Sequence, residues 1–188
     1  FIQTRAPLME ESLQVQGILL THDHGDHTCL ESIDRIRQSS EDVKYVGPAE
    51  SVTRLREAGI DAASITQVTA GDTATLADMT VHTVFAKPPD GDAANDIKAP
   101  DVSHLGYVVD VSGARVYVSG DPINTFADHE ELLAPIRKLQ PQIGFLTNHP
   151  SEGEFPFFDG SARTAAALGL HTAVPAHYGC FVSRDYDP

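Results

Sequence analysis

Seven residues near the start of the chain, Thr-His-Asp-His-Gly-Asp-His at positions 21 to 27, restrict what this sequence can fold into more than any other stretch. Residues 15 to 20, directly before them, are short, apolar and without a helical period, which is typical of a buried strand. Side chains two positions apart on an extended chain point the same way. We therefore expect His22 and His24 to leave the end of this strand together and to bind one metal ion from one side.

The rest of this segment predicts further ligands. Gly25 lets the backbone turn, so that Asp26 and His27 face a second ion or the other side of the first. Neutral imidazole suits zinc, and a mixed imidazole and carboxylate set also admits manganese or iron. A surface histidine cluster or a purification tag is the alternative, but tags are uninterrupted histidine runs at a terminus. We predict a divalent metal centre holding one or two ions of zinc or manganese.

Length and composition exclude several classes of protein. A chain of 188 residues is long enough for one domain with a sizeable core, so we predict a single domain over residues 1–188. Its formal charge of -14 repels phosphate backbones and anionic lipid head groups over the bulk of the surface, so nucleic acid is a poor first guess as substrate. We expect a small-molecule substrate and neither a nucleic-acid nor a membrane partner. Cys29 and Cys180 form no CxxC motif, which suits the cytoplasm. No apolar run approaches the roughly 18 to 20 residues of a membrane span.

Strands and helices are expected to alternate along the chain. Apolar periods predict helices at residues 30–36, 49–58, about ten residues from 128, and 161–168. Short apolar runs predict strands at residues 45–46, 105–111, 115–119, 142–146 and 172–175, and residues 65–86 read as a run of antiparallel strands. Residues 87–103 hold three prolines and form a long, mobile and protease-sensitive loop. This order fits an α/β protein of the αββα sandwich type.

The pattern HxHxDH after a strand resembles the metallo-β-lactamase superfamily. Further phrases are most similar to its ascorbate-6-phosphate lactonase branch: Lys-Tyr-Val-Gly-Pro at 44–48, Val-Tyr-Val-Ser-Gly-Asp at 116–121 and Val-Pro-Ala-His at 174–177. The resemblance covers residues 15 to 180. It implies the αββα metallo-β-lactamase sandwich, with the ligands on loops along one edge of the sheets and a segment near residues 87–103 overhanging the active site.

The start and end of the chain suggest a truncated domain. Relatives usually have two or three strands before the HxHxDH strand, and here the chain begins at Phe1 without an initiating methionine and stops at Pro188. We expect the first strands of the sandwich to be missing and the domain to be cut at both ends. The apolar sheet surface left uncovered would promote self-association, so a homo-oligomer is one expected state.

Two residues farther along the chain also follow predicted strands. Asp121 comes after Val116 to Gly120, and a carboxylate can bridge two cations; the alternative is an aspartate that caps a turn. His177 follows Ala176, with a hydrogen-bonded core histidine as the alternative. By the resemblance, the metal ligands are His22, His24, Asp26, His27, Asp121 and His177, and Asp26 is also the catalytic residue that orients a water or accepts its proton.

The third histidine motif of the superfamily is absent where it is expected. Lys87, Pro88 and Pro89 follow the strand ending at Ala86, and His104 is either the substitute ligand or a surface histidine at a strand edge. If His104 does not bind a metal ion, the two ions have unequal numbers of ligands, or the site holds one ion. His149 is a candidate proton shuttle or substrate contact, or simply a loop histidine. We interpret three more histidines as structural: His82, His129 and His171.

The ligand set supports hydrolysis by a metal-bound hydroxide. The first hypothesis, taken from the resemblance, is a small polar ester or lactone whose phosphate or carboxylate meets a cation, the candidates being Lys87, Lys98, Arg163 and Arg184. Tyr178 and Asn148 are candidates to steady a substrate oxygen. The second hypothesis is a phosphodiesterase acting on a small molecule or lipid head group. The third, a binding domain with a structural metal, is disfavoured because structural zinc sites are usually closed and rich in cysteine.

Overall fold

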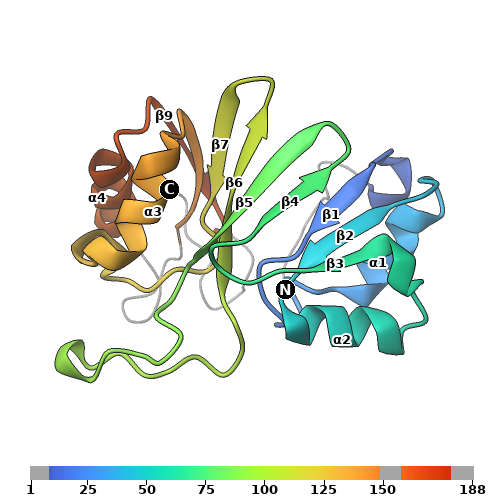
Figure 1. Cartoon of the computed structure of the whole chain (residues 1–188), viewed down its shortest axis with the longest axis horizontal. Helices are drawn as coiled ribbons and strands as arrows, with labels where there is room; N and C mark the ends of the chain where they lie inside the picture. The colour runs from blue at the N-terminus through green and yellow to red at the C-terminus, as the bar shows by residue number, and fades with distance from the viewer. Residues whose placement is uncertain (1–8, 149–157, 179–188) are drawn as a thin grey trace.

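Two β-sheets face each other, and each carries helices on its outer side (Figure 1). The computed structural model describes residues 9–148 and 158–178. Helices α1 and α2 flank the three-stranded sheet, and α3 and α4 flank the six-stranded sheet (Figure 1). The predicted αββα layering is confirmed.

The smaller sheet is parallel throughout. Its strands are β1 (Gly17–Leu19), β2 (Lys44–Gly47) and β3 (Ile65–Gln67), in that order. Helices α1 (Leu30–Arg37) and α2 (Ala49–Glu57) make the two crossovers that parallel strands need. The expectation of an antiparallel run from residue 65 is therefore wrong for β3. The alternating pattern indicates a half-buried strand but does not give its direction. Because α2 returns the chain to the same end of the sheet, β3 runs parallel to β2.

The larger sheet keeps its strands in chain order. It contains β4 (Thr73–Leu76), β5 (Met79–Phe85), β6 (Leu105–Val111), β7 (Ala114–Val118), β8 (Ile143–Thr147) and β9 (Thr172–Ala176). The first four strands are antiparallel, and the predicted turn between β6 and β7 has positive φ at both Ser112 and Gly113. Strands β7, β8 and β9 are parallel because α3 (Glu130–Leu139) and α4 (Phe158–Leu168) cross over between them.

Single-turn 3-10 helices occupy Glu10–Ser12, Ala62–Ser64, Ala93–Asn95 and Phe126–Asp128. The helix predicted from residue 128 begins two residues later, because the 3-10 turn Phe126–Asp128 precedes it. Helix α4 begins at residue 158, whereas the sequence predicts its start at residue 161. Among the described residues, no helix has both the length and the apolar content that crossing a membrane requires.

Three apolar clusters hold the layers together. One lies between the sheets and includes Val46, Leu76 and Tyr107; the other two lie under the helix pairs of the two sheets. The Tyr107 hydroxyl, on β6, donates a hydrogen bond of 2.6 Å to the carbonyl oxygen of Leu20, just after β1. The two sheets are therefore joined by a buried polar contact at the edge where the predicted ligands lie.

The directions of the strands bring the predicted ligands together at that edge. Strands β1, β7 and β9 each precede predicted ligands, namely those of the loop at residues 21–27, Asp121 and His177. His104 instead stands before β6, but β6 is antiparallel to β7, so the beginning of β6 lies beside the end of β7. Four segments far apart in the sequence consequently meet at one edge of the sandwich.

We expect Tyr107→Phe to destabilise the protein more than Tyr117→Phe. Both tyrosines are fully buried, and the Tyr117 hydroxyl has no hydrogen-bond partner among the described residues. Losing the Tyr107 hydroxyl leaves the Leu20 carbonyl without its donor, which costs roughly 1 to 3 kcal/mol. Urea unfolding of both variants measures the difference, and equal losses would show that the contact between the sheets adds nothing.

Candidate metal centre

The loop after β1 is a tight turn stabilised by its own backbone. The amide nitrogens of His27 and Thr28 both donate to the carbonyl oxygen of His24, at 3.0 and 2.8 Å. Gly25 lies within this turn but is not among the residues with positive φ, and a Cβ there would meet no atom within 4 Å. The expectation that this turn depends on glycine is therefore wrong, because the local backbone is accessible to any residue.

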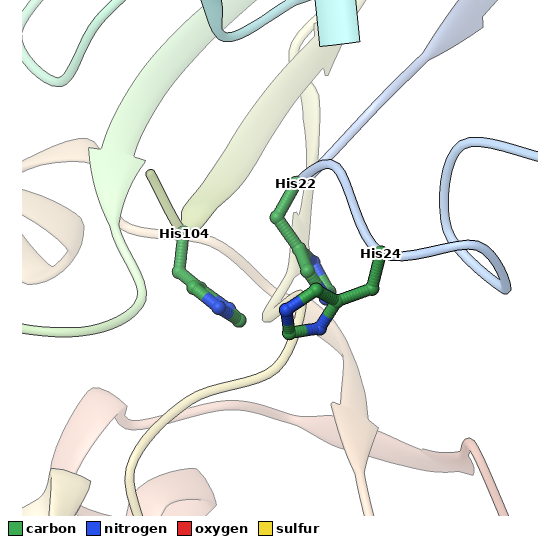
Figure 2. A group of neighbouring side chains, drawn as sticks. All are labelled: His22, His24 and His104. Atoms are coloured by element: carbon green, nitrogen blue, oxygen red, sulfur yellow. The ribbon is translucent and has the colours of Figure 1, made fainter. Parts of the chain in front are cut away.

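His22, His24 and His104 form the first cluster (Figure 2). The His22 ring stacks on that of His104 with centroids 4.0 Å apart, and it meets the His24 ring edge-on at 4.6 Å. The backbone nitrogen of Leu105 donates to the carbonyl oxygen of Thr21 at 2.9 Å, which fixes the start of β6 against the loop. Of the two interpretations of His104, the structure places it inside the cluster and buried, not at the surface.

Asp26, His27 and His177 form the second cluster. The Nε2 atoms of His27 and His177 lie 3.0 Å apart, and Asp26 Oδ2 lies 3.8 and 3.6 Å from them. His177 has a φ of 57°, in the left-handed region that non-glycine residues rarely adopt. Such backbone strain is concentrated at functional sites, because only a surrounding structure that over-determines the conformation can hold it.

Asp121 lies between the two clusters. Its Oδ2 atom is 3.7 Å from His22 Nε2 and 3.3 Å from His27 Nε2, and its Oδ1 atom is 3.8 Å from His177 Nε2. Burial by itself would raise the pKa of Asp121, but the contact with His27 and the charges of the neighbouring histidines outweigh it and hold the pKa below its usual value. The carboxylate is therefore ionised and positioned to bridge.

Gly120 allows Asp121 to lie between the two clusters. It has a φ of +59°, and a Cβ on it would lie 2.4 Å from the backbone carbonyl oxygen of Leu105. Both the conformation and the contact with backbone exclude a larger residue. The site thus requires a glycine directly before Asp121. This glycine is part of the motif at residues 116–121, but the sequence does not show why it is needed.

The donor atoms fit a divalent cation. His22 Nε2, both ring nitrogens of His104 and Asp121 Oδ1 are buried and lack a hydrogen-bond partner among the described residues. Buried polar atoms without partners are costly, and a cation satisfies nitrogen and carboxylate donors together. Tetrahedral zinc at 2.0–2.1 Å would separate its ligands by about 3.3 Å. The spacings of 3.0 to 3.8 Å around His27, His177 and Asp121 are close to that value.

Two further residues orient the histidines. Thr21 Oγ1 lies 3.1 Å from Nδ1 of His22 and 3.2 Å from Nδ1 of His27, so one hydroxyl oxygen can accept from both rings and leave both Nε2 atoms as donors to an ion. Nε2 of His24 lies 3.1 to 3.2 Å from both carboxylate oxygens of Asp101. Sequence reasoning missed both residues. Thr21 is at least adjacent to His22, whereas nothing in the sequence connects Asp101 with a histidine 77 positions earlier.

Burial keeps His22 and His104 of the first cluster uncharged. It lowers the pKa of His22 to about 2, with the neighbouring His27 contributing, and it lowers the pKa of His104 to about 3, with Lys87 contributing. Neutral imidazole is the form that binds metal ions. The environment therefore holds these two side chains ready to bind at neutral pH.

A cavity of about 520 Å³ lies beside the first cluster. It is enclosed by residues of the 87–103 loop, including Lys87, Lys98 and Asp101, and by the segment 123–125 that closely follows Asp121. The loop is not featureless, because a 3-10 turn at Ala93–Asn95 is closed by paired backbone hydrogen bonds between Asp92 and Ile97. Lys87 is only 4% exposed, so the residue found in place of the superfamily histidine faces inward.

The other predicted site residues have different positions. Arg163 pairs with Asp128 on the surface and does not line this cavity, while Arg184 and His149 lie outside the described residues. The Asn148 side chain is buried and Tyr178 is exposed. Of the three histidines interpreted as structural, His82 contacts Thr73, and His129 contacts Thr125 and Glu131, in each case away from the clusters.

The chain is a two-sheet sandwich with histidines and carboxylates gathered at one edge, an arrangement typical of a metal-binding domain. Residues 2–178 match the beta-lactamase superfamily domain, and the chain belongs to the metallo-β-lactamase superfamily. It is 28% identical to a protein of Salmonella choleraesuis called "Probable L-ascorbate-6-phosphate lactonase", over 93% of this chain and 52% of that protein. The chain thus spans about half the length of the curated relatives it matches.

Solved structures support the same fold. The isothiocyanate hydrolase from Delia radicum gut bacteria aligns with a TM-score of 0.70 at 17% identity, covering 99% of this chain and 74% of that one. Igni18, a metallo hydrolase of the archaeon Ignicoccus hospitalis, aligns with a TM-score of 0.65 at 18% identity, covering 92% and 67%. At these identities the similarity establishes the fold alone.

Replacing His104 should lower the metal content of purified protein. We expect His104→Ala to lose about one equivalent of zinc or manganese relative to the parent protein, because the first cluster would keep only two imidazoles. His82→Ala, a partly exposed histidine on β5, is the matched control and should change nothing. Elemental analysis measures both, and equal metal content in the two variants would return His104 to a structural role.

Acid should destabilise the metal-free protein through the first cluster. The pKa values of His22 and His104 in the folded state lie below the value of about 6.5 in an unfolded chain. The unfolded state therefore takes up protons first, and stability falls as the pH drops below about 6.5. Melting temperatures in excess chelator between pH 7 and 5 test this, and His104→Gln should show a shallower decline than the parent protein.

Proposed function

We propose that this chain is the metal-dependent hydrolase domain of an enzyme that acts on a small polar ester or lactone carrying an anionic group. One observation supports this most directly. Two ligand clusters meet at Asp121, and the first lies beside the cavity that contains Lys87 and Lys98. The ligand clusters and these two lysines therefore adjoin one cavity, whose lining also includes Asp96 and Asp101.

The first cluster would hold one ion through His22, His24 and His104, and the second would hold another through Asp26, His27 and His177, with Asp121 between them. A divalent cation bound here would lower the pKa of water from 15.7 to about 7 and polarise the bond to be cleaved. Zinc and manganese both suit this set of nitrogen and oxygen donors.

Asp26 is the candidate for handling the proton. Its side chain is 25% exposed, whereas that of Asp121 is 5% exposed, and its Oδ2 atom lies within 4 Å of both His27 and His177. A carboxylate that reaches solvent from the edge of the cluster can orient an attacking water and accept its proton. Asp121, buried between the clusters, serves instead to hold them together.

Lys87 and Lys98 favour a substrate with a phosphate or carboxylate. Both belong to the loop that encloses the cavity, and Asp101 of the same wall is already engaged with His24. An ammonium group in a partly closed cavity binds an anionic oxygen more strongly than one in bulk water. The lactonase name of the curated relatives supports a lactone with a phosphate handle, and the same lysines would also meet a phosphodiester.

Hydrolysis assays on one metal-loaded preparation distinguish the two substrate classes. We expect turnover of a phosphorylated or carboxylated lactone and little turnover of bis(p-nitrophenyl) phosphate. Chelator should abolish the activity, and metal should restore it. Faster cleavage of the phosphodiester would replace the lactone assignment, and no metal-dependent hydrolysis of either compound would contradict the proposed function.

Neutralising the lysines should affect substrates according to their charge. We expect Lys87→Met and Lys98→Met to raise KM for an anionic lactone by roughly 10- to 150-fold, since a lost charged hydrogen bond costs about 1.5 to 3 kcal/mol. A neutral lactone should be affected little. Lys138→Met, an exposed lysine on α3, is the control. Equal effects on both lactones would show that the cavity does not bind the anionic group.

A further inference from the structure

Helix α2 contacts both of the segments that carry the first cluster. His22 and His24 belong to the loop after β1 of the smaller sheet, and His104 precedes β6 of the larger sheet. No single sheet register fixes the distance between them, because they come from different sheets. Three residues about one turn apart on α2 make these contacts: Glu50, Ser51 and Arg54.

Arg54 holds the residue between the two histidines of the loop. Its Nη2 atom donates to Asp23 Oδ2 at 3.0 Å and to the Asp23 carbonyl oxygen at 3.1 Å, and its Nε atom lies 2.8 Å from Asp23 Oδ1. A planar guanidinium that contacts both carboxylate oxygens and the backbone fixes position and orientation together. The backbone between His22 and His24 is thereby tied to α2.

Glu50 holds the residue before His104. Its Oε1 atom accepts from the backbone nitrogen of Ser103 at 3.1 Å and from the Ser103 hydroxyl at 3.0 Å. Glu50 and Arg54 are four residues apart and lie on the same side of the helix. One face of α2 therefore contacts Asp23 in the loop after β1 and Ser103 in the segment before β6.

A buried pair of hydroxyls adds a third connection. Ser51 Oγ lies 2.9 Å from Thr28 Oγ1, and the Thr28 hydroxyl donates to the carbonyl oxygen of His22 at 2.8 Å. The helix itself is firmly seated, because Val52 and Leu55 on it are fully buried. Helix α2 thus reaches the backbone carbonyl of His22 through Thr28.

We propose that α2 is the positioning element of the first cluster, with Arg54 and Glu50 as the positioning residues that set His22 and His24 against His104. This inference rests on the proposed metal centre. Neither residue contacts the ion in this proposal. Each acts through its neighbour, Asp23 or Ser103, and so controls how closely three imidazoles approach a common point. Groups that hydrogen-bond the ligands themselves change metal affinity by roughly 10- to 100-fold when they are replaced, and we expect Arg54 and Glu50, one residue farther from the ion, to act at the lower end of that range.

The test compares matched substitutions on the same helix. Arg54→Met and Glu50→Gln remove the two contacts, while Arg56→Met and Glu57→Gln change exposed residues of the same type on α2. Zinc dissociation constants are measured by chelator competition, and melting temperatures are measured in excess chelator. We expect the first pair to bind one zinc equivalent roughly tenfold more weakly and the control pair to bind as the parent protein does.

Two more variants separate positioning from simple stability. Arg54→Lys keeps the charge without the planar fork and should weaken zinc binding less than Arg54→Met does. Asp23→Asn combined with Arg54→Met should weaken binding no more than the stronger single variant, because both remove the same contact. A lower melting temperature in chelator with unchanged zinc affinity would overturn the inference and show a merely structural role.

The outcomes also separate this inference from the proposed function. If the parent protein binds no zinc or manganese, the metal centre fails and the inference fails with it. If the parent protein binds metal and the variants of Arg54 and Glu50 bind it equally well, only the role of α2 fails, and the metal centre stands.

Discussion

The burial of polar donor atoms at one edge of the sandwich is the constraint on which the rest of this structure depends. Nitrogens of His22 and His104 and an oxygen of Asp121 are withdrawn from water without hydrogen-bond partners among the described residues. Such a group of atoms opposes folding unless something compensates for their lost hydration. A bound cation would compensate for it, and the stability of this edge and its chemistry would then have the same physical origin.

The fold brings these atoms together through strand direction. Strands β1, β7 and β9 end where β6 begins, so four loops open at the same edge. The contact from Tyr107 to Leu20 and the contacts of α2 with Asp23 and Ser103 then join the halves of the sandwich. The core supplies the apolar free energy, and these few polar contacts determine how one half lies against the other.

Two positions at the site have a left-handed backbone conformation. Gly120 adopts a left-handed conformation against the Leu105 carbonyl, and His177 adopts one without being glycine. Gly25, in the middle of the ligand loop, carries no such strain. The density of glycine and histidine in a motif is therefore a poor guide to where the backbone is constrained, because only contacts with other segments impose that constraint.

The sequence by itself determined the class of this protein. The ligand loop after a buried strand, the phrase ending in Asp121 and the alternation of elements led to the αββα sandwich and to six residues that the structure brings together. These signals are local: a ligand spacing or an apolar period acts over a few residues and is visible in one window. Their role as metal ligands stays a prediction.

Tertiary structure alone decided the direction of β3, the inward position of His104 and the contacts of Thr21, Asp101 and α2 with the site. Each of these depends on which segments meet after folding. His104 and Asp101 lie roughly eighty residues from the histidines they approach, and no sequence period or spacing encodes that distance. The pairing of β6 with β7 and the crossover through α2 create it, since packing of the whole chain selects one among many contacts that local sequence permits.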